Sequence, residues 1–369
     1  RKTERLAGVQ HRGEGCHAGT DEILPWRFPM KKIRVGLIRC DSHGAYFGAL
    51  MAEHDPLRLG TPLDDVTKKK YTWQLGAAYF WFYTFYCGPT QMTAPFVGGF
   101  EITRVWDEFP DAAACLAAVF DSKPMVCETV EAASDDVDLV FIADCKYIGS
   151  DHLELATPGI EKGVPTFIDK PLAYDLEDAR GIVDLACQHD VPILSLSILS
   201  ALPQGARFAA RFPEVGQVEF ATVKGGGVKM SGHIHAISLA QNFFGAGGIE
   251  AVEAMGQNEL GFMHLIYKDA PGLPRHGVIL NCDVGSDHFA AFHASAFGPL
   301  GAIHSGELGG FTFPDGAAAI IKQIRTMVET GKPPVPYDDI LENIAVATAG
   351  REAQRTGKAV RLADIGFDR

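Results

Sequence analysis

Clustered positive charge is what this sequence most plainly lacks. Lys and Arg number 33 against 46 Asp and Glu, for a formal net charge of −13. The one basic run, Lys68-Lys69-Lys70, is short and typical of a solvated loop. Nucleic acids and anionic membrane surfaces are bound through clustered basic faces. We therefore expect neither a nucleic-acid partner nor a membrane partner.

Cysteine pairs at metal-binding or disulfide spacing are also missing. The eight cysteines are Cys16, Cys40, Cys87, Cys115, Cys127, Cys145, Cys187 and Cys282. None of them forms a CxxC pair or a regular repeat, so neither a zinc site nor a disulfide framework is expected. Scattered cysteines of this kind are typical of reduced, buried thiols, and they predict a cytoplasmic protein without a metal site.

Long apolar runs are absent as well. The most lipophilic segment, AAYFWFYTFYCG, has only about a dozen residues, whereas a helix needs about 20 to cross a bilayer. Residues 1–29 are polar and lack the apolar core of a signal peptide. We interpret residues 1–30 as an N-terminal extension, either a disordered arm or a translated upstream sequence, because MKKIRV, beginning at Met30, has the form of a natural start that leads into a first strand.

What the sequence does have, over residues 31–200, is an alternation of strand and helix patterns. The strand candidates are IRVGLI, FEITRVW, DLVFIA, PTFID and VPILSLSI. Segments between them, such as DAAACLAAVF and LEDARGIVDLACQHD, have helical spacing. This alternation predicts an α/β fold with a Rossmann-like, doubly wound parallel sheet. The strand, turn and helix of VGLIRCDSHGAYFGALM stand where such sheets normally hold the pyrophosphate of a dinucleotide.

Residues 201–369 have a different character and predict a second, α+β domain. QVEFATVKG, IEAVEAMG, FMHLIYKD, HGVILNCDVG and HFAAFHASAFG indicate a largely antiparallel open sheet. Two helices should close the chain, one with apolar positions from Ile320 to Val328 and one from about Asp338 to Arg355, before Gly357. An exposed sheet face would suit a homodimer or homotetramer.

An insertion at about residues 55–98 separates the first helix from the next strand and holds most of the aromatic run. It is either an extra packed helix or hairpin, or a lid whose aromatic side chains cover the active site.

The segment GVPTFIDKPLA carries the strongest motif. It resembles the GKHVLCEKPLA-type motif of the Gfo/Idh/MocA oxidoreductases, with Asp169 where Glu is usual. KGGGVKMSGHIHAISLAQNFFG resembles that family's GGG-x-x-x-D-x-G-x-H-x-x-D-L segment, and ETGKPPVPYDDILENIAVATAGREAQRTGKAVRL resembles its closing helix pair. The resemblance spans about Lys31 to Leu362.

The resemblance implies that Lys170 and His235 are catalytic, orienting a substrate hydroxyl and moving its proton next to a nicotinamide. The chemistry of these side chains agrees, because a desolvated lysine or a histidine can accept a proton near neutral pH. Asp169 and Pro171, which flank Lys170, would then contact the cofactor.

Three departures weaken the second motif. The family's catalytic aspartate falls on Ser231, its later aspartate on Ser238, and its glycine on His233. Ser231 and His233 are candidate substrate contacts, although His233 could equally pack in the core. On an extended segment, His233 and His235 could share a face and bind a metal, but no third ligand is evident nearby.

The dinucleotide fingerprint is also altered. Where the family has G-x-G-x-x-G, this chain has Arg39, Asp41 and Gly44, so only the glycine for close helix–strand packing remains. Asp41 brings negative charge and a Cβ to the place of the pyrophosphate. Arg39, Ser42 and His43 are the groups that could offset this by contacting phosphate.

Two further strand ends supply candidates. Asp107, in TRVWD, could bind the adenosine ribose, which favours NAD over NADP, or it could be the N-cap of the next helix. Asp144 after DLVFIA is a candidate cofactor contact, and Lys146 and Tyr147 are candidate substrate contacts; His152 follows slightly later. We interpret the remaining histidines of the second domain as structural: His264, His276, His288, His293 and His304.

The resemblance therefore implies a NAD-dependent oxidoreductase that exchanges hydride at a secondary hydroxyl of a sugar, cyclitol or related polyol. The alternative is a non-redox, ligand-binding or regulatory descendant of the same scaffold, since both the fingerprint and the catalytic aspartate have changed. The fold alone does not decide between them.

Overall fold

The computed structural model describes residues 31–60, 76, 78–83, 90–145, 148–225, 230–256, 259–282 and 291–369. The chain divides into two compact units, Arg1–Lys31 and Lys32–Arg369, and the second unit holds all of the helices and strands named below. Several sequence predictions fall outside the described residues: the N-terminal extension, the basic run, Cys16, Cys87, Lys146, Tyr147 and His288.

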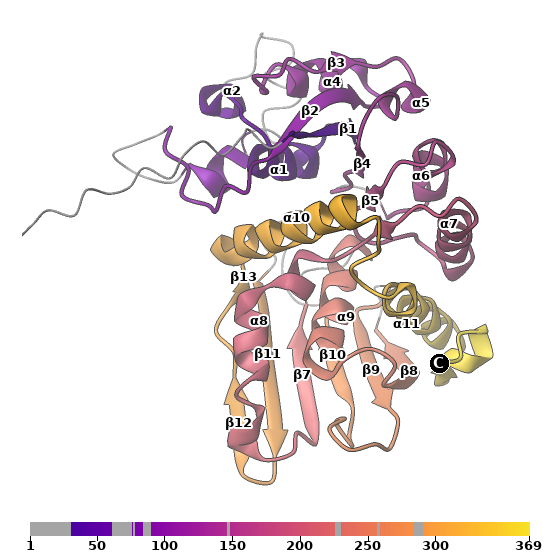
Figure 1. Ribbon diagram of the computed structural model, residues 1–369. Helices are drawn as coiled ribbons and strands as arrows, with labels where there is room; N and C mark the ends of the chain where they lie inside the picture. Colours follow the sequence, from indigo (N-terminus) through magenta and orange to yellow (C-terminus); the bar gives the residue numbers. More distant parts are fainter. Residues whose placement is uncertain are drawn as a thin grey trace, which may run out of the picture. The chain divides into compact units, whose positions relative to one another are not determined.

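A six-stranded parallel sheet forms the first half of this unit, in the order β3-β2-β1-β4-β5-β6 (Figure 1). Its strands are β1 (Ile33–Ile38), β2 (Phe100–Trp106), β3 (Met125–Val126), β4 (Leu139–Ile142), β5 (Thr166–Ile168) and β6 (Ile193–Leu194). β4 and β5 are buried along their whole length, as is typical of strands covered on both faces. The predicted Rossmann-like parallel sheet is confirmed.

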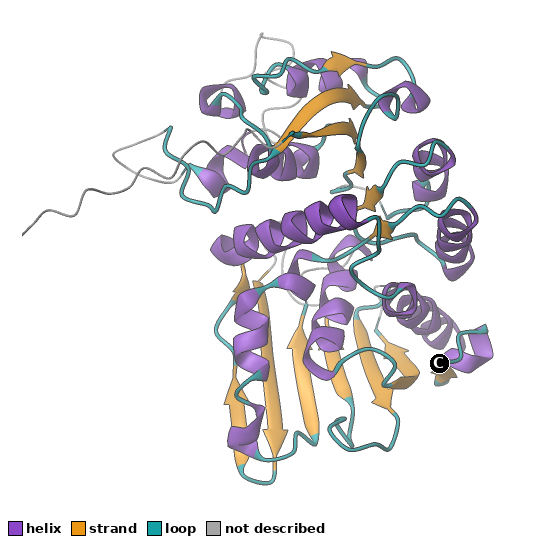
Figure 2. Cartoon of the chain, in the orientation of Figure 1, coloured by secondary structure: helices purple, strands orange, loops and turns teal. Residues whose placement is uncertain are grey.

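Helices connect these strands (Figure 2). They are α1 (Ser42–Met51), α2 (Pro56–Gly60), α4 (Pro110–Ala117), α5 (Val130–Ala133), α6 (His152–Glu161) and α7 (Leu176–Gln188). The two segments with helical spacing in the sequence, DAAACLAAVF and LEDARGIVDLACQHD, form α4 and α7. Asp175 caps α7 by accepting a hydrogen bond from the N–H of Asp178 at 3.0 Å, which satisfies one of the free donors at a helix start.

The second half holds an eight-stranded sheet, in the order β12-β11-β7-β10-β9-β8-β14, with β13 paired to β11. Its strands are β7 (Phe220–Lys224), β8 (Ile249–Met255), β9 (Phe262–Tyr267), β10 (Val278–Asn281), β11 (Ala291–Gly298), β12 (Gly301–His304), β13 (Leu308–Gly309) and β14 (Val360–Arg361). Every pair is antiparallel except β7 and β10. The predicted, largely antiparallel sheet is confirmed.

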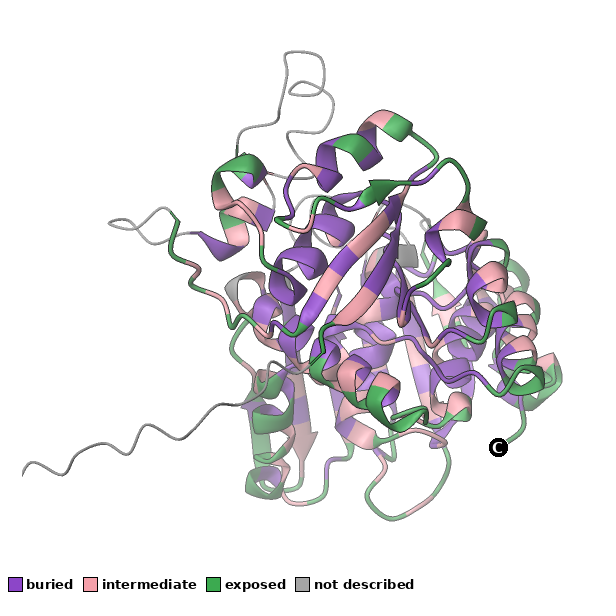
Figure 3. Cartoon of the chain, turned by 45° about the horizontal axis from the view of Figure 1, so that its top comes forward, coloured by how far each residue is buried: buried purple, intermediate pink, exposed green. Residues whose placement is uncertain are grey.

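The helices of this half are α8 (Pro203–Ala209), α9 (Met230–Phe244), α10 (Phe313–Thr330) and α11 (Tyr337–Thr356). Four short 3-10 turns complete the described elements: η1 (Ile198–Ala201), η2 (Phe212–Val215), η3 (Gly310–Thr312) and η4 (Leu362–Ile365). The two predicted closing helices are α10 and α11, and Gly331 and Gly357 end them in the left-handed conformation that favours glycine. The central strands β4 and β5 are buried, whereas β3 at the edge of the first sheet is exposed (Figure 3).

The segment around His233 and His235 is helical, and the extended backbone considered for it is wrong. Both residues lie in α9. Positions two apart on a helix point to different sides, so the two imidazoles do not share a face. His233 is fully buried, whereas His235 is only partly buried.

The described part of the insertion packs into the core. Residues 78–82 are helical, and Phe82 is fully buried with its ring 4.5 Å from that of Tyr46 on α1. Trp81 meets Phe313 of α10 edge-on. These contacts favour the packed-helix interpretation over the lid. Among the described residues, no helix has the length and apolar character needed to cross a membrane.

Candidate active site

The first turn, Arg39 to Gly44, follows β1 and begins α1. Arg39 has a φ of 68°, the left-handed conformation that usually needs glycine. A Cβ added to Gly44 would lie 2.5 Å from the carbonyl oxygen of Arg39, so α1 can approach the strand end only with glycine there. The backbone of a dinucleotide-binding turn is therefore kept, although two of its glycines are replaced.

The Asp41 carboxylate occupies the N-terminus of α1. Its Oδ1 accepts hydrogen bonds from the N–H groups of His43 (2.8 Å) and Gly44 (3.1 Å), and its Oδ2 accepts one from the N–H of Cys145 (2.6 Å). Asp41 is buried. Free N–H groups at this helix end are what a pyrophosphate binds in such folds. Here the protein's own carboxylate takes them.

Arg39 sits in a buried ionic network instead of projecting into solvent. Its Nη1 lies 3.7 Å from Oδ2 of Asp144, and its Nη2 contacts the carboxylate of Asp151 at the start of α6. The same Asp144 oxygen is 3.1 Å from Nε2 of His152, and both of these side chains are fully buried. The Asp144 carboxylate thus lies between the Arg39 guanidinium and the His152 ring.

A second set of polar groups follows β5. Oδ2 of Asp169 accepts from the N–H of Asp144 (3.1 Å) and lies 2.5 Å from Nδ1 of His43. Burial lowers the pKa of His43, but the charges of Asp169 and Cys145 outweigh it and raise the pKa well above the ordinary value. Next in the chain, Lys170 is almost fully buried and is joined to Pro171 by a cis peptide bond.

His235 lies on α9, within range of the charge of Lys170. Its Nδ1 is 2.7 Å from the hydroxyl of Ser197, which follows β6. Burial, and then the charges of Lys170 and His43, lower the pKa of His235 well below its ordinary value. His235 is therefore neutral at neutral pH and can accept a proton. Lys170, Ser197 and Ser238 line one small cavity between the two halves.

Asp107 ends β2 next to the first turn. Its Oδ2 accepts from the N–H of Cys40 (2.7 Å) and its Oδ1 from the N–H of Phe109 (2.9 Å). Burial raises its pKa, against the effect of these two bonds. The N-cap alternative is wrong, because Phe109 is the N-cap of α4. A carboxylate has further acceptor sites, so Asp107 can still bind a hydroxyl.

The structure thus gathers most of the predicted site residues at the carboxyl ends of the parallel strands, where ligands bind in such sheets. We call this set the strand-end site: Arg39, Asp41, Ser42, His43, Asp107, Asp144, Asp169, Lys170, Pro171 and His235. His233 is not part of it, since its burial favours packing over substrate contact. The side chain of Ser231 is not described. In the part of the chain that the structure covers, no group of three or more His, Cys, Asp or Glu could hold a metal ion.

Sequence reasoning missed Cys145, Asp151 and Ser197. Cys145 and Ser197 follow β4 and β6, so their position after a strand could have marked them. The expectation that the cysteines are buried is wrong for Cys187, an exposed residue, and for Cys145, which is partly exposed.

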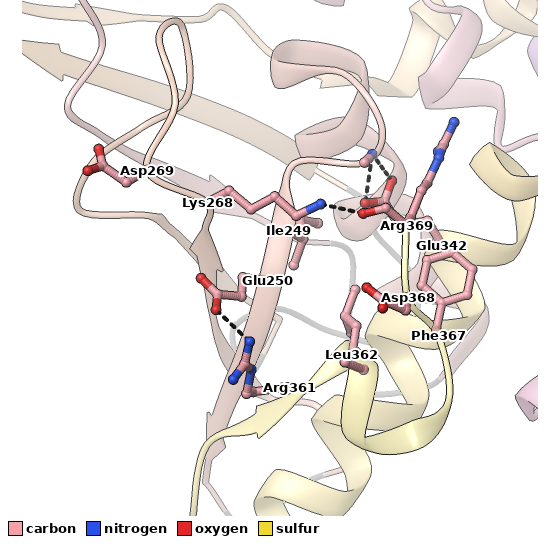
Figure 4. Close-up of a pocket in the computed structure, with 12 residues that line it drawn as sticks. Ile249, Glu250, Lys268, Asp269, Glu342, Arg361, Leu362, Phe367, Asp368 and Arg369 are labelled. Carbon is pink, nitrogen blue, oxygen red and sulfur yellow. Dashed lines mark hydrogen bonds and ion pairs between the residues drawn. The ribbon is translucent and has the colours of Figure 1, made fainter.

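A larger cavity lies elsewhere, beside the C-terminal residues (Figure 4). It measures about 210 Å³ and is lined by both acidic and basic groups, including Lys268, Glu342, Arg361 and Arg369. Glu342 accepts from the N–H of Gly247 there, and Lys268 donates to the carbonyl of Arg369. Arg361 also pairs with Glu250, at 3.1 Å.

Comparison with known proteins gives one family match. Residues 75–196 match the sequence model of the oxidoreductase family with a NAD-binding Rossmann fold, GFO_IDH_MocA. Over these residues, the chain is similar to the Gfo/Idh/MocA family. The match includes β2 to β6 with the Lys170 motif, and it begins after the first turn. No curated protein sequence matches the chain.

Solved structures share this Gfo/Idh/MocA fold over nearly the whole chain. A myo-inositol dehydrogenase from Corynebacterium glutamicum is 16% identical, with a TM-score of 0.63, covering 90% of this chain and 99% of that one. GenD2 from gentamicin A biosynthesis, solved with NAD, is 15% identical, with a TM-score of 0.66 and coverage of 96% and 99%. Scyllo-inositol dehydrogenase from Lactobacillus casei, with NAD(H) and scyllo-inositol, is 14% identical, with a TM-score of 0.63 and coverage of 90% and 100%. At these identities the likeness shows the fold.

Proposed function

We propose that this protein is a NAD-dependent oxidoreductase that exchanges hydride at a secondary hydroxyl of a cyclitol, sugar or related polyol. The observation that carries the proposal is the buried Lys170 after β5, which lines a small cavity with Ser197, whose hydroxyl is in turn 2.7 Å from Nδ1 of His235. The neighbours described as inositol dehydrogenases with NAD(H) and an inositol support the same substrate class. We infer a cytoplasmic homodimer or homotetramer.

The residues present fit both ends of NAD. Asp107 lies where an adenosine ribose is held, which favours NAD over NADP. Lys170, Pro171 and His235 lie where the family holds the nicotinamide. Within the first turn, the buried Ser42 hydroxyl has no hydrogen-bond partner among the described residues and can donate to a phosphate.

The pyrophosphate of NAD fits the first turn only if the Asp41 carboxylate moves. The Asp41 carboxylate holds the N–H groups of His43, Gly44 and Cys145. A pyrophosphate must therefore displace this carboxylate or bind beside it at a cost in repulsion. When bound, NAD supplies the carbon that accepts or returns hydride. We expect weaker binding than at a glycine-rich turn.

Lys170 and His235 divide the remaining work. The Lys170 ammonium donates a hydrogen bond to the substrate oxygen and stabilises negative charge that develops on it. His235 is neutral, and if Nδ1–H donates to Ser197, then Nε2 carries the lone pair that takes the hydroxyl proton. Ser197 thereby does part of what the missing aspartate would do, since it orients the ring.

The test is NAD⁺ reduction with a panel of cyclitols and sugars. We expect turnover of at least one polyol by the wild-type protein. We expect no turnover when Lys170 is changed to Ala. Absence of turnover across the panel, in protein that nevertheless binds NADH, would reject the substrate class.

The filled helix N-terminus specifically favours a second candidate, a non-redox protein that binds a polyol-like ligand on the same scaffold. This candidate expects a cyclitol or sugar to raise the melting temperature while NADH neither raises it nor quenches protein fluorescence. Fluorescence quenching by NADH would exclude it.

A further inference from the structure

We propose that the small cavity lined by Lys170 and Ser197 binds a single water molecule, which acts through Ser197 to keep Nε2 of His235 without a proton. The catalytic consequence rests on the proposed function, because Nδ1 of His235 contacts Ser197 and only a bare Nε2 can accept the proton of a substrate hydroxyl. Ser197 is then a positioning residue, and the water completes its hydrogen bonds.

The Ser197 hydroxyl is held in place from two directions. Ser197 is the N-cap of η1, and its Oγ accepts a hydrogen bond from the N–H of Leu199 at 3.0 Å. The same oxygen is 2.7 Å from Nδ1 of His235, and the side chain is buried. The hydroxyl therefore cannot turn away from the imidazole without losing the cap of η1.

The hydrogen bond between Ser197 and His235 can run in two directions. If the hydroxyl donates to Nδ1, the proton of the neutral imidazole lies on Nε2. If Nδ1–H donates to the hydroxyl, Nε2 is bare and the Ser197 O–H needs another acceptor. Among the residues that the structure describes, only Leu199 and His235 hydrogen-bond to this oxygen, and the Leu199 N–H is a donor. The second direction thus requires an acceptor that is not a described residue.

The cavity beside Ser197 has the size and the lining to hold that acceptor. Its volume is about 20 Å³, and a water molecule needs about 10–15 Å³ or more and two to four polar partners. The polar side chains that line the cavity are Lys170, Ser195, Ser197, Ser200, Ser238 and Asn343. A bound water has two lone pairs, so it can accept from Ser197 and from a second donor of this lining.

The wall opposite Ser197 is fixed by α9 and α11. Ser238 Oγ donates to Oδ1 of Asn343 at 3.3 Å, and Nδ2 of Asn343 donates to Oε1 of Gln241 at 2.7 Å. The Ser238 oxygen keeps its lone pairs for a proton of the water. The described lining has one positive charge, on Lys170, and no carboxylate. It therefore favours a neutral ligand over a cation.

The tautomer matters because His235 is neutral. Burial, and then the charges of Lys170 at the end of β5 and His43 on α1, lower the pKa of His235 well below its ordinary value. Phe292 of β11 meets the ring edge-on, with centroids 5.7 Å apart, and adds no charge. A neutral imidazole has one proton, and the hydrogen bond at Nδ1 decides which nitrogen carries it.

The first experiment measures the tautomer of His235 by ¹⁵N NMR of the full chain at pH 7, with His235→Gln to assign the signal. We expect the wild type to carry the proton on Nδ1. Ser197→Ala should move it to Nε2, because Nδ1–H loses its acceptor, whereas Ser197→Thr keeps the hydroxyl and should keep the wild-type tautomer. A proton on Nε2 in the wild type, or no change in Ser197→Ala, would overturn the proposal.

The second experiment locates the water. A crystal structure of the full chain that shows ordered solvent should place one water in the cavity, within hydrogen-bond distance of Ser197 Oγ. Ser238→Thr keeps the hydroxyl and adds a methyl group to the lining, so it should exclude the water and move the proton toward Nε2. Ser238→Ala leaves room for the water and is the matched control. An empty cavity in the wild type, or an unchanged tautomer after the water is lost, would contradict the proposal.

Turnover separates this inference from the proposed function. With a polyol that the wild type oxidises, Ser197→Ala should lower kcat about tenfold or more at unchanged KM, and Ser197→Thr should restore it. A chain that holds the water and the Nδ1–H tautomer but oxidises no polyol would reject the proposed function and leave the water site standing. Wild-type kcat in Ser197→Ala would overturn the positioning role of Ser197.

Discussion

The two ends of the strand-end site differ in what their polar groups face. At the Lys170 end, Lys170 and Ser197 line a small cavity, and the neutral His235 lies 2.7 Å from the Ser197 hydroxyl. At the first turn, the equivalent polar groups face one another: Asp41 takes the N–H groups, and Arg39 pairs with Asp144 and Asp151. One end is arranged for a ligand, and the other is satisfied internally. Backbone geometry alone does not make a phosphate site, because its donors must also be free.

Removing Lys170 should give the largest effect, since it takes the positive charge from the Lys170 end of the strand-end site. We expect Lys170→Ala to lower kcat for polyol oxidation about a thousandfold, because the developing charge on the substrate oxygen loses its donor. Steady-state kinetics would measure this. Lys322→Ala, at an exposed lysine of α10, is the control and should retain full activity. Wild-type turnover in Lys170→Ala would remove this residue from the mechanism.

At the first turn, where the polar groups pair with one another, a substitution should instead lower the free energy of unfolding. Asp144→Ala leaves Arg39 and His152 without their shared carboxylate in a buried place, so the free energy of unfolding should fall by about 3–5 kcal/mol. Urea denaturation would measure it. Asp135→Ala, which breaks the exposed pair with Lys162, should lower the free energy of unfolding far less, because solvent screens this pair. Equal losses in the two variants would mean that the buried network does not stabilise the turn.

The pH dependence of kcat tests the role of His235 at the Lys170 end of the strand-end site. Because the pKa of His235 lies well below its ordinary value, the neutral base persists as pH falls through 6.5, and kcat should decline only at lower pH. His235→Gln should lower kcat about a hundredfold and abolish this acid limb. His304→Gln, at an exposed histidine of the second sheet, should leave the profile unchanged. An acid limb that survives in His235→Gln would assign the base elsewhere.

Asp41→Gly should give the smallest change, in the affinity for NADH. It should make the first turn more like the Lys170 end, with polar groups free to bind a ligand. Removing this carboxylate frees three N–H groups and takes away a negative charge, so NADH should bind several-fold more tightly, with more effect at low salt, where repulsion is less screened. Fluorescence quenching at two salt concentrations would show it. Unchanged or weaker binding would mean that the turn is not a cofactor site limited by Asp41.

Both sheets and the closing helices could be predicted from the sequence because their apolar periodicity is local. The helix α9 could not, since HIHAIS alternates over a few residues in a way that also suits extended backbone, and contacts with η1 and α11 decide the outcome. The Lys170 position followed from its motif. The partners of Arg39 did not, because Asp144 and Asp151 are more than a hundred residues away and meet it only when β1, β4 and α6 assemble.

The central claim is that the protein still binds a nicotinamide dinucleotide at the strand-end site, although Asp41 occupies the pyrophosphate donors. Calorimetric titration of the full wild-type chain with NADH tests it most directly. We expect saturable binding to one site per chain, with a smaller heat and affinity than in Asp41→Gly. No detectable heat in either protein would contradict the claim and would leave the non-redox scaffold as the better explanation.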